Sequence, residues 1–553
     1  MGSLGFSFIS VLYLFAPFVC AGVRSDAPVT ATLPPAGPYH VAGSRIIDAV
    51  GREFLMRGTT MPTVTLNKSD IDGDGKQFGP FSRSSFTTLR QRMNMNTIRV
   101  PLDTQAYREN AEYRARVKEI VRKANELELL VILAADQPDA SFWARCAAEF
   151  KVNPNVFFRL ASGGDVGAIR ASGATQPVIV AGDTIADPNV IYEVTPSYAT
   201  TRTDAERQTQ FGFLSGTVPV LVNGLDPQLD HVGSECAAFP ADPAEASRLV
   251  EDNLNYFDSH HISWTLSSFL PGRMITEYRF YNWSKLDDGW TCGESPSRSG
   301  IAMMLQSHLW NRNPHGLFPV NPTTGNFVLP RGAISSAYGP ILAERDMTAS
   351  ARPLPTVLGN VAVDVTDSRG VKRTAPLLYT GGGWSLITFV VPAASATGPA
   401  EIAVVRTDGS RSTGKVVIAD FAPGFWAASA DGRGAVIGTV FQRFANGKTR
   451  TFQTADCSVY GCRPVAIPLA PHVATTIRLE GSGFRYAGPR PDIRATVGDL
   501  RVPVVSVTRG EIPEHDRLTI ELPDELRGRG ETDLMVNVNG IWSNVVRINC
   551  GSL

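Results

Sequence analysis

Five aspartates stand just beyond the ends of short apolar runs, where carboxylates are available for acid/base chemistry. They are Asp103, Asp136, Asp165, Asp183 and Asp226. Two carboxylates facing each other across a substrate act as acid/base and nucleophile, or as acid and base with a water between them. A short acidic side chain in such a position also caps the following helix by accepting backbone N–H groups. The elements that carry these residues decide between the two roles.

The apolar runs alternate with amphipathic segments from about residue 39 to residue 309. After a β-hairpin around the turn Asp48–Gly51, a first strand is predicted to end at Arg57-Gly58. Seven further strands are predicted at 96–101, 129–133, 156–160, 176–182, 189–194, 218–222 and 261–265. Helices are predicted at 84–95, 107–127, 142–150 and 249–257. This alternation predicts a single (β/α)₈ TIM barrel over residues 39–315, with its chemistry at the carboxyl ends of the strands.

The stretch 153–165, NPNVFFRLASGGD, is a predicted buried strand that ends in a Gly-rich loop. It resembles the fourth-strand signature of glycoside hydrolase family 5, in which the strand ends in Asn-Glu-Pro and the Glu is the acid/base. The pair Arg57-Gly58, the Asn-x-x-Arg pattern ending at Arg99, and Phe142-Trp143 are similar to the same family. The resemblance implies a cellulase-like barrel that acts on or binds polysaccharide.

The residues that the family uses for hydrolysis are absent from this sequence. The resemblance places the acid/base at residue 163 and the nucleophile at residue 224, which here are Gly163 and Gly224. A histidine of the sixth strand is replaced by Thr195. Glycine offers neither a proton donor nor a nucleophile. The expected function is therefore a catalytically impaired pseudoenzyme that keeps a glycan-binding cleft. The substrate-binding candidates are Arg99, Asp136, Tyr198 and Trp264.

Two alternatives stay open. An active O-glycosyl hydrolase would use relocated carboxylates, and the best pair is Asp165 with Asp226, each two residues past a glycine of the expected motif. Helix capping is the commoner role for an aspartate after a strand, so we favour it for the aspartates that follow the predicted strands. The other alternative is a surface scaffold or adhesion protein in which the barrel performs no chemistry.

One acidic motif suggests a metal. Asp70, Asp72 and Asp74, followed by Gly75, match the first half of an EF-hand loop. The bidentate Glu at the twelfth position is replaced by Phe81, so a solvated acidic turn is favoured over a weak structural calcium site. No other cofactor is expected.

Composition and the N-terminal segment bear on partners and location. The formal net charge of −1 over 553 residues provides no basic field for nucleic acid or anionic lipid. Residues 4–21 form one apolar run, which predicts a signal peptide over 1–21 followed by a linker over 22–38. An uncleaved N-terminal anchor is the alternative. The expected partner is a polysaccharide or cell-surface glycan, and the expected location is secreted or cell-surface in a bacterium.

The sequence pattern changes from alternating helices and strands to strands alone after a linker predicted over 316–352. Short alternating strands with Gly-rich turns predict two all-β sandwich units, over 353–466 and 467–553. The two units repeat the same pattern, including hairpin turns at Asp408-Gly409 and Asn539-Gly540. The pair resembles the immunoglobulin-like IPT/TIG modules at the C-terminus of many secreted bacterial proteins, which usually serve as spacers or adhesion elements.

The seven cysteines suggest disulfides in an exported protein. Cys457 and Cys462 lie close together around a turn and form the first predicted pair. Cys236 and Cys292 lie in Gly/Ser/Pro-rich loops and form the second. Cys146 falls on a predicted helix and is expected to be a buried thiol.

Overall fold

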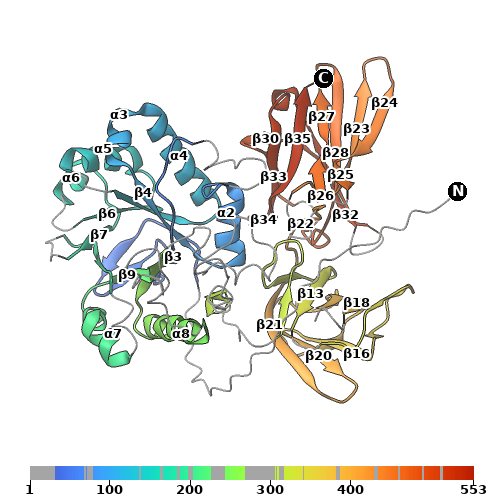
Figure 1. Cartoon of the computed structure of the whole chain (residues 1–553), viewed down its shortest axis with the longest axis horizontal. Coiled ribbons are helices and arrows are strands. Elements are labelled where there is room, and N and C mark those ends of the chain that lie inside the picture. The colour runs from blue at the N-terminus through green and yellow to red at the C-terminus, as the bar shows by residue number, and fades with distance from the viewer. Residues whose placement is uncertain are drawn as a thin grey trace. The chain divides into compact units, whose positions relative to one another are not determined.

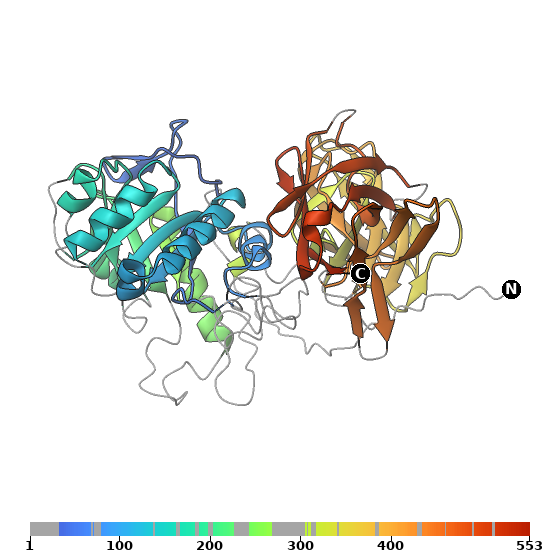
Figure 2. The same ribbon diagram turned by 90° about the horizontal axis from the view of Figure 1, so that it is seen from above.

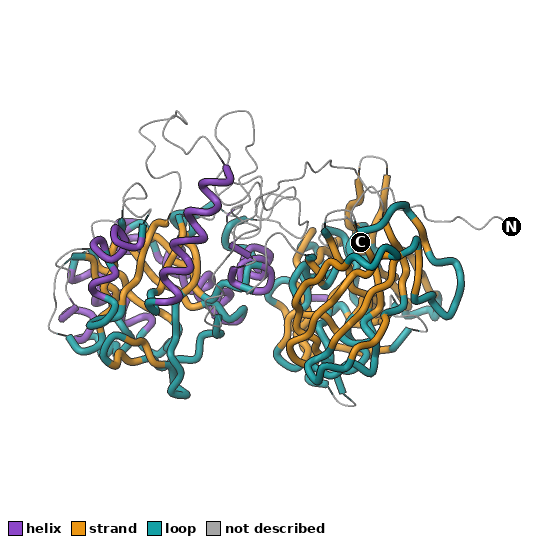
Figure 3. Tube along the Cα trace, turned by 90° about the horizontal axis from the view of Figure 1, so that it is seen from below, coloured by secondary structure: helices purple, strands orange, loops and turns teal. Residues whose placement is uncertain are grey.

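The structure is a computed structural model, and it describes residues 32–67, 70, 79–135, 139–161, 166–182, 187–196, 203–225, 243–267, 305–306, 308–310, 317–339, 342–381, 386–428, 434–458, 461–488, 491–510 and 515–552. The chain divides into two compact units, one over residues 27–314 and one that contains residues 315–553. Helices are gathered in the first unit, whereas strands and loops make up nearly all of the second (Figure 3).

Eight parallel strands of the first unit close into a barrel (Figure 1). In chain order they are β3 (Arg57–Thr60), β4 (Thr97–Leu102), β5 (Leu130–Ala135), β6 (Val156–Leu160), β7 (Val178–Ala181), β8 (Val190–Val194), β9 (Val220–Leu225) and β10 (Ser263–Leu266). Strand β10 pairs with both β9 and β3, which completes the ring. The predicted eight-stranded parallel barrel is confirmed.

The first barrel strand begins at Arg57, whereas the sequence predicted that it ends at Arg57-Gly58. The backbones of β3 and β4 lie close together at Gly58, where a Cβ would lie 1.8 Å from the carbonyl oxygen of Thr97. Only glycine allows the two backbones to approach this closely, so the pairing of β3 with β4 starts here and continues to Thr60.

Helices follow most strands and surround the barrel (Figure 2). They are α2 (Arg83–Thr87), α3 (Thr104–Glu109), α4 (Ala111–Glu126), α5 (Ala140–Phe150), α6 (Val166–Ala171), α7 (Asp204–Gln210) and α8 (Pro243–Ser259), with a π-helix over Thr88–Arg92 and a 3₁₀ turn over Gly212–Leu214. The single helix predicted over 107–127 is two helices. Asn110 has an extended backbone, and its side chain accepts hydrogen bonds from the N–H groups of Glu112 and Tyr113, which starts α4 anew. No helix in the described part of the chain is long and apolar enough to cross a membrane.

A two-stranded hairpin precedes the barrel and packs against its apolar interior. It consists of β1 (His40–Ala42) and β2 (Arg45–Ile47), joined through Gly43, and the predicted turn at Asp48–Gly51 follows β2, with Ile47 pairing antiparallel with Glu53 across it. Asp48 builds a separate second turn, since its carboxylate accepts the N–H groups of Val50 and Arg52. Interior residues from six barrel strands or their flanks meet the hairpin region in one cluster: Tyr39, Ile46, Phe54, Met56, Leu130, Ile132, Phe157, Ile179, Ile191 and Leu221.

Residues 317–419 of the second unit form a first β-sandwich. One sheet has the order β11 (Phe318–Val320), β13 (Ile334–Tyr338), β19 (Leu386–Val390), β18 (Leu377–Gly381), β14 (Met347–Thr348). The facing sheet has the order β12 (Val328–Pro330), β21 (Arg411–Ala419), β20 (Gly398–Arg406), β16 (Val361–Thr366), β15 (Val357–Leu358), with β17 (Lys372–Thr374) on β16. One apolar core lies within this sandwich. Four of these strands come from residues 316–352, which the sequence pattern had indicated as a linker.

Residues 424–552 form a second β-sandwich with its own core. One sheet has the order β24 (Thr449–Gln453), β23 (Gly438–Phe444), β28 (Val473–Ser482), β32 (Asp516–Glu521), β31 (Val504–Thr508), with β22 (Gly424–Phe425) on β28. The other has the order β27 (Ala466–Leu469), β35 (Val546–Ser552), β33 (Gly530–Val538), β29 (Ile493–Val497), β30 (Leu500–Val502), with β34 (Ile541–Trp542) on β33. The boundary between the two sandwiches therefore lies near residue 420 and not at the predicted 466/467. Strands β23 and β24, which precede residue 466, belong to the same sheet as β28, β32 and β31.

The expected local signals of the β-unit are found in the structure. Asp408-Gly409 connects β20 to β21, and Asn539-Gly540, both with positive φ, connects β33 to β34. The predicted disulfide between Cys457 and Cys462 is present, on the hairpin of β25 (Ala455–Ser458) and β26 (Gly461–Pro464). In the barrel unit, Cys146 is buried as expected, and burial raises the pKa of its thiol to about 12.

Asp367 organises a turn of the first sandwich and gives a testable pH dependence. Its carboxylate accepts N–H groups of Ala396, Val371 and Arg369 and an N–H of the Arg373 guanidinium at 2.6 Å. The backbone donors, led by Ala396, lower the pKa of this carboxyl from its ordinary value to about 2. A carboxyl with a lowered folded-state pKa stabilises the fold above its unfolded pKa, and that contribution is lost as the pH falls through the folded pKa.

We therefore expect Asp367→Asn to lower the melting temperature at pH 5 to 7. The deficit relative to the unmodified protein should shrink as the pH falls from about 4 to 2. Thermal melts over this range measure it, with the exposed Asp456→Asn as the reference. A deficit that stays constant across these pH values would contradict the assignment.

Candidate functional site

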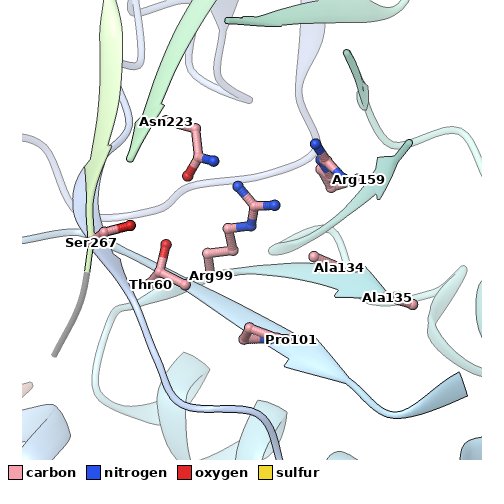
Figure 4. Close-up of a pocket in the computed structure, with 8 residues that line it drawn as sticks. All are labelled: Thr60, Arg99, Pro101, Ala134, Ala135, Arg159, Asn223 and Ser267. Carbon is pink, nitrogen blue, oxygen red and sulfur yellow. The ribbon is translucent and has the colours of Figure 1, made fainter. Parts of the chain in front are cut away.

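The carboxyl ends of the barrel strands surround a pocket of about 230 Å³. Side chains alternate along each strand, so residues in register across the parallel strands share a face. The pairs Thr60–Arg99, Ala134–Arg159, Ala181–Glu193 and Asn223–Thr265 are in register and belong to the interior face. The pocket is lined by Thr60, Arg99, Pro101, Ala134, Ala135, Arg159, Asn223 and Ser267 (Figure 4).

Glu193 of β8 lies inside the barrel between two arginines. Its side chain is only 1% exposed. The guanidinium of Arg159 donates from Nη2 to Oε1 at 2.7 Å and from Nε to both carboxylate oxygens at 3.0 and 3.2 Å. Arg99 donates from Nη1 to Oε2 at 3.4 Å. The fork of Arg159 thus fixes the carboxylate, and Arg99 makes a longer contact from the other side.

Asn223 carries a second polar group into the same space. Its Oδ1 accepts a hydrogen bond of 2.9 Å from the hydroxyl of Thr265. With the oxygen engaged there, the amide nitrogen is turned toward the guanidinium groups of Arg99 and Arg159 (Figure 4). The hydroxyls of Thr60 and Ser267 lie together at the other edge of the pocket in the same view. The site therefore presents mostly hydrogen-bond donors, with small residues of β5 leaving space beside them.

The structure places only part of the predicted site. Arg99 lies in the pocket, as the Asn-x-x-Arg pattern suggested. Thr195 follows β8 and is exposed. The other predicted binding and catalytic candidates lie outside the described residues: Asp136, Gly163, Asp165, Asp183, Tyr198 and Asp226.

Trp264 does not form a sugar-binding floor. It is in register with Val222 on β9 and with Arg57 on β3, whereas the neighbouring interior positions are Leu221 and Asn223. Its side chain therefore belongs to the outer face of the barrel, and it has 0% exposure. An aromatic residue at a strand end indicates binding only when the alternation points it inward, which the sequence motif does not specify.

Gly224 occupies a β-bulge. Asn223 pairs with Thr265 and Leu225 pairs with Leu266, so Gly224 has no opposite residue on β10. Its φ is 78°, in the left-handed region that favours glycine. The resemblance expects a nucleophile at this position. The backbone here has a conformation that a residue with a side chain would adopt only under strain.

The aspartate and metal predictions have mixed outcomes. Asp103 caps α3 by accepting the N–H of Ala106 at 2.8 Å, in agreement with the favoured capping role. The carboxylate of Asp70 accepts a hydrogen bond from the hydroxyl of Thr65. Asp72 and Asp74 lie outside the described residues, as do Cys236 and Cys292. Among the residues that are described, no group of three His, Cys, Asp or Glu side chains could hold a metal ion.

Sequence reasoning missed Arg159 and Glu193 as site residues, although both lie on correctly predicted strands. Each is a charged residue within an otherwise apolar parallel strand, VFFRL and VIYEV. Such strands are buried on both faces, so an ion in one of them needs a partner on the same face. Opposite charges on β6 and β8, both inside the barrel, are the signal that could have identified the pair.

Comparisons with known proteins give structural similarities at low sequence identity. No protein-family model matches the chain, and no curated protein matches it. Among solved structures, it is similar to a halotolerant GH5 cellulase from an Icelandic hot spring isolate, at 14% identity and a TM-score of 0.36, covering 51% of this chain and 96% of that one. The tri-modular endo-β-1,4-glucanase B of Bacillus halodurans matches at 12% identity and a TM-score of 0.34, covering 85% and 98%.

A GH5 xyloglucanase of Bacteroides ovatus in complex with a heptasaccharide matches at 11% identity and a TM-score of 0.29, covering 46% of this chain and 75% of that one. Likenesses at these scores do not establish a function for this chain. The barrel assignment rests on the closed order of parallel strands β3 to β10 in this chain.

Proposed function

We propose that the barrel binds a polysaccharide or cell-surface glycan at its mouth pocket and does not hydrolyse it. The observation that carries the proposal is the composition of the pocket: Arg99, Arg159 and Asn223 supply donors for hydroxyl or acidic oxygens, and the one carboxylate described among them, Glu193, is engaged by both arginines. The sequence resemblance to glycoside hydrolase family 5 supports a glycan as the ligand, because it includes Arg99.

Hydrolysis of a glycosidic bond needs two carboxylates, about 5 Å apart for retention and further apart for inversion. Within the described part of the barrel mouth, Glu193 has no carboxylate partner, and its oxygens already accept hydrogen bonds from two guanidinium groups. It is therefore poorly placed to protonate a leaving oxygen or to attack an anomeric carbon. The bulge at Gly224 agrees with this, because β9 offers Asn223 as its last interior side chain.

The activity test uses the full chain. We expect no release of reducing sugar from β-1,4-glucan, β-1,4-mannan or xylan above a heat-inactivated control. Turnover that disappears in Asp226→Asn or Asp165→Asn would instead establish an active glycosidase with relocated carboxylates.

The binding test uses affinity electrophoresis of the full chain in gels that contain a soluble polysaccharide. We expect Asn223→Ala to weaken retardation by roughly five- to tenfold in affinity, since it removes an amide donor without leaving a charge unpaired. Asn446→Ala, in an exposed turn of the second sandwich, is the matched control and should bind normally. If the unmodified protein is retarded by no polysaccharide, the proposal fails and a scaffold function is favoured.

A further inference from the structure

We propose that the mouth pocket recognises an acidic sugar, with the carboxylate of a uronate residue held by Arg159, Arg99 and Asn223. This inference rests on the proposed glycan-binding function and specifies its ligand class. It is drawn from the charges and the donor geometry of the described pocket residues. A neutral glycan would make no ion pair with these arginines, whereas a uronate would.

The charge balance of the pocket is positive over the described residues. Two guanidinium groups meet one carboxylate, and the remaining lining residues in this part of the mouth are neutral: Thr60, Pro101, Ala134, Ala135, Asn223 and Ser267. The side chains of Arg99 and Arg159 are only 11% and 18% exposed, so water screens their charges incompletely. A buried cation is stabilised by anions around it, and among the described residues Arg159 pairs with Glu193, so an acidic ligand would add a second anion beside it.

The donor geometry fits a carboxylate. Arg159 uses Nε and Nη2 on Glu193, and its Nη1 makes no hydrogen bond within the described residues. The amide nitrogen of Asn223 is turned toward the same space because its oxygen is held by Thr265. A ligand carboxylate between these two groups would receive N–H donors from both, and charge-assisted hydrogen bonds of this kind are about twice as strong as neutral ones.

The other edge of the pocket suits the hydroxyl groups of the same sugar. The Thr60 hydroxyl oxygen is buried and has no hydrogen-bond partner in the described part of the chain. Figure 4 shows it beside Ser267 and the stem of Arg99, on the side of the pocket away from Arg159. The hydroxyls of Thr60 and Ser267 lie in the lining of the pocket, and a hydroxyl can both donate to and accept from the hydroxyl groups of a sugar. A volume of about 230 Å³ lies below the range of pockets for drug-sized ligands, which favours a single saccharide unit over several.

Glu193 acts here as a positioning residue. Its bidentate contact fixes the plane of the Arg159 guanidinium. The position of Nη1 is therefore set before a ligand binds. A guanidinium that is already oriented loses less side-chain entropy on binding than a free one. The pair therefore functions as a prepared anion site and is more than an internal salt bridge.

The test compares two polymers with one backbone. The full chain is titrated with polygalacturonate and with its fully methyl-esterified form, and the same comparison is made for alginate and its propylene glycol ester. We expect the free acids to bind at least about tenfold more tightly at low ionic strength, with the preference shrinking toward high salt as the charges are screened.

Variants locate the effect. Arg159→Gln should reduce the affinity for the free acid by roughly tenfold or more and the affinity for the ester by a much smaller factor, so that the preference for the acid is lost. Arg170→Gln is the matched control, because Arg170 makes a comparable bidentate contact with Asp187 on the outside of the barrel, and it should not alter the preference. The double change Arg159→Gln with Glu193→Gln removes both charges together. It should lose the preference as well, and a melting curve establishes that it is folded.

The outcomes separate the two proposals. Equal binding of acid and ester by the unmodified protein would overturn the acidic-sugar inference and leave glycan binding intact. The inference would also be overturned if Arg159→Gln kept the preference for the acid over the ester. The same holds if this variant bound dextran sulfate as tightly as the unmodified protein does, because the attraction would then be a property of the whole surface. Failure to bind either form of either polymer, together with every neutral glycan, would overturn the proposed function itself.

Discussion

Replacing Trp264 by alanine is expected to lower the free energy of unfolding of the barrel by about 3–5 kcal/mol. Trp264 is one of the two largest fully buried side chains in the described part of the protein, and its register places it between the barrel wall and the surrounding layer. Truncation removes the transfer free energy of the indole and leaves a cavity that the rigid strands cannot close. Urea unfolding followed by far-ultraviolet circular dichroism measures the loss.

Trp264→Phe provides the matched control. The indole Nε1 makes no hydrogen bond in the described part of the structure, so phenylalanine sacrifices volume alone, and the loss should be well below that of alanine. At temperatures where both variants are folded, glycan binding should equal that of the unmodified protein. Normal stability combined with lost binding in Trp264→Ala would contradict this assignment and restore Trp264 to the binding site.

Asp258→Ala is expected to destabilise the barrel by a similar amount, about 3–5 kcal/mol, because it leaves a buried cation without its partner. Asp258 on α8 pairs with Nη2 of Arg57, whose side chain is only 1% exposed. Nε2 of His308 lies 3.0 Å from the other carboxylate oxygen. Burial lowers the pKa of the Arg57 guanidinium, and the charge of Asp258 opposes that shift.

Two further variants distinguish the loss of this ion pair from simple loss of packing. Arg57→Met combined with Asp258→Leu removes both charges and should recover much of the stability lost in Asp258→Ala. Asp139→Ala, which removes an exposed helix cap of α5, should cost only about 1 kcal/mol. Chemical denaturation of the unmodified protein, Asp258→Ala, the double variant and Asp139→Ala under one condition measures these differences in stability. A double variant that is less stable than Asp258→Ala would show that the charges are not the source of the effect.

The barrel was predictable because its signals are local. Runs such as VFFRL and LLVILA are too apolar for anything but a strand buried on both faces, and their alternation with helices leaves few topologies. The positions of turns and domain limits were less predictable. The turn at Asp48–Gly51 was predicted, whereas the turn at Gly43 that joins β1 to β2 was not. Residues 316–352 lack long strands, and they pair with strands that are distant in the sequence, as β12 does with β21.

The candidate site was less predictable than the fold because it depends on which way each side chain points. Arg99 was found through the resemblance of Asn96 to Arg99 to the Asn-x-x-Arg pattern of glycoside hydrolase family 5. Trp264 was predicted to bind sugar inside the barrel mouth. Only the positions next to it on β10 point into the barrel, so the prediction was one residue out of step with the strand. Glu193 and Arg159 are far apart in the sequence and form a site only because β6 and β8 present the same face to the barrel. A long-range pair of this kind is visible only once the strand register is known.

The bulge at Gly224 also limits how hydrolysis could be engineered into this scaffold. A library that varies residue 224 alone would sample side chains on a left-handed backbone, and it would display them at a place where β9 is out of step with β10. Productive libraries would need to shorten the segment between Asn223 and Leu225 by one residue, so that the strand regains its regular pairing before a carboxylate is introduced. In directed evolution, such a deletion is a different class of event from a point substitution, and mutagenesis by base replacement would not reach it.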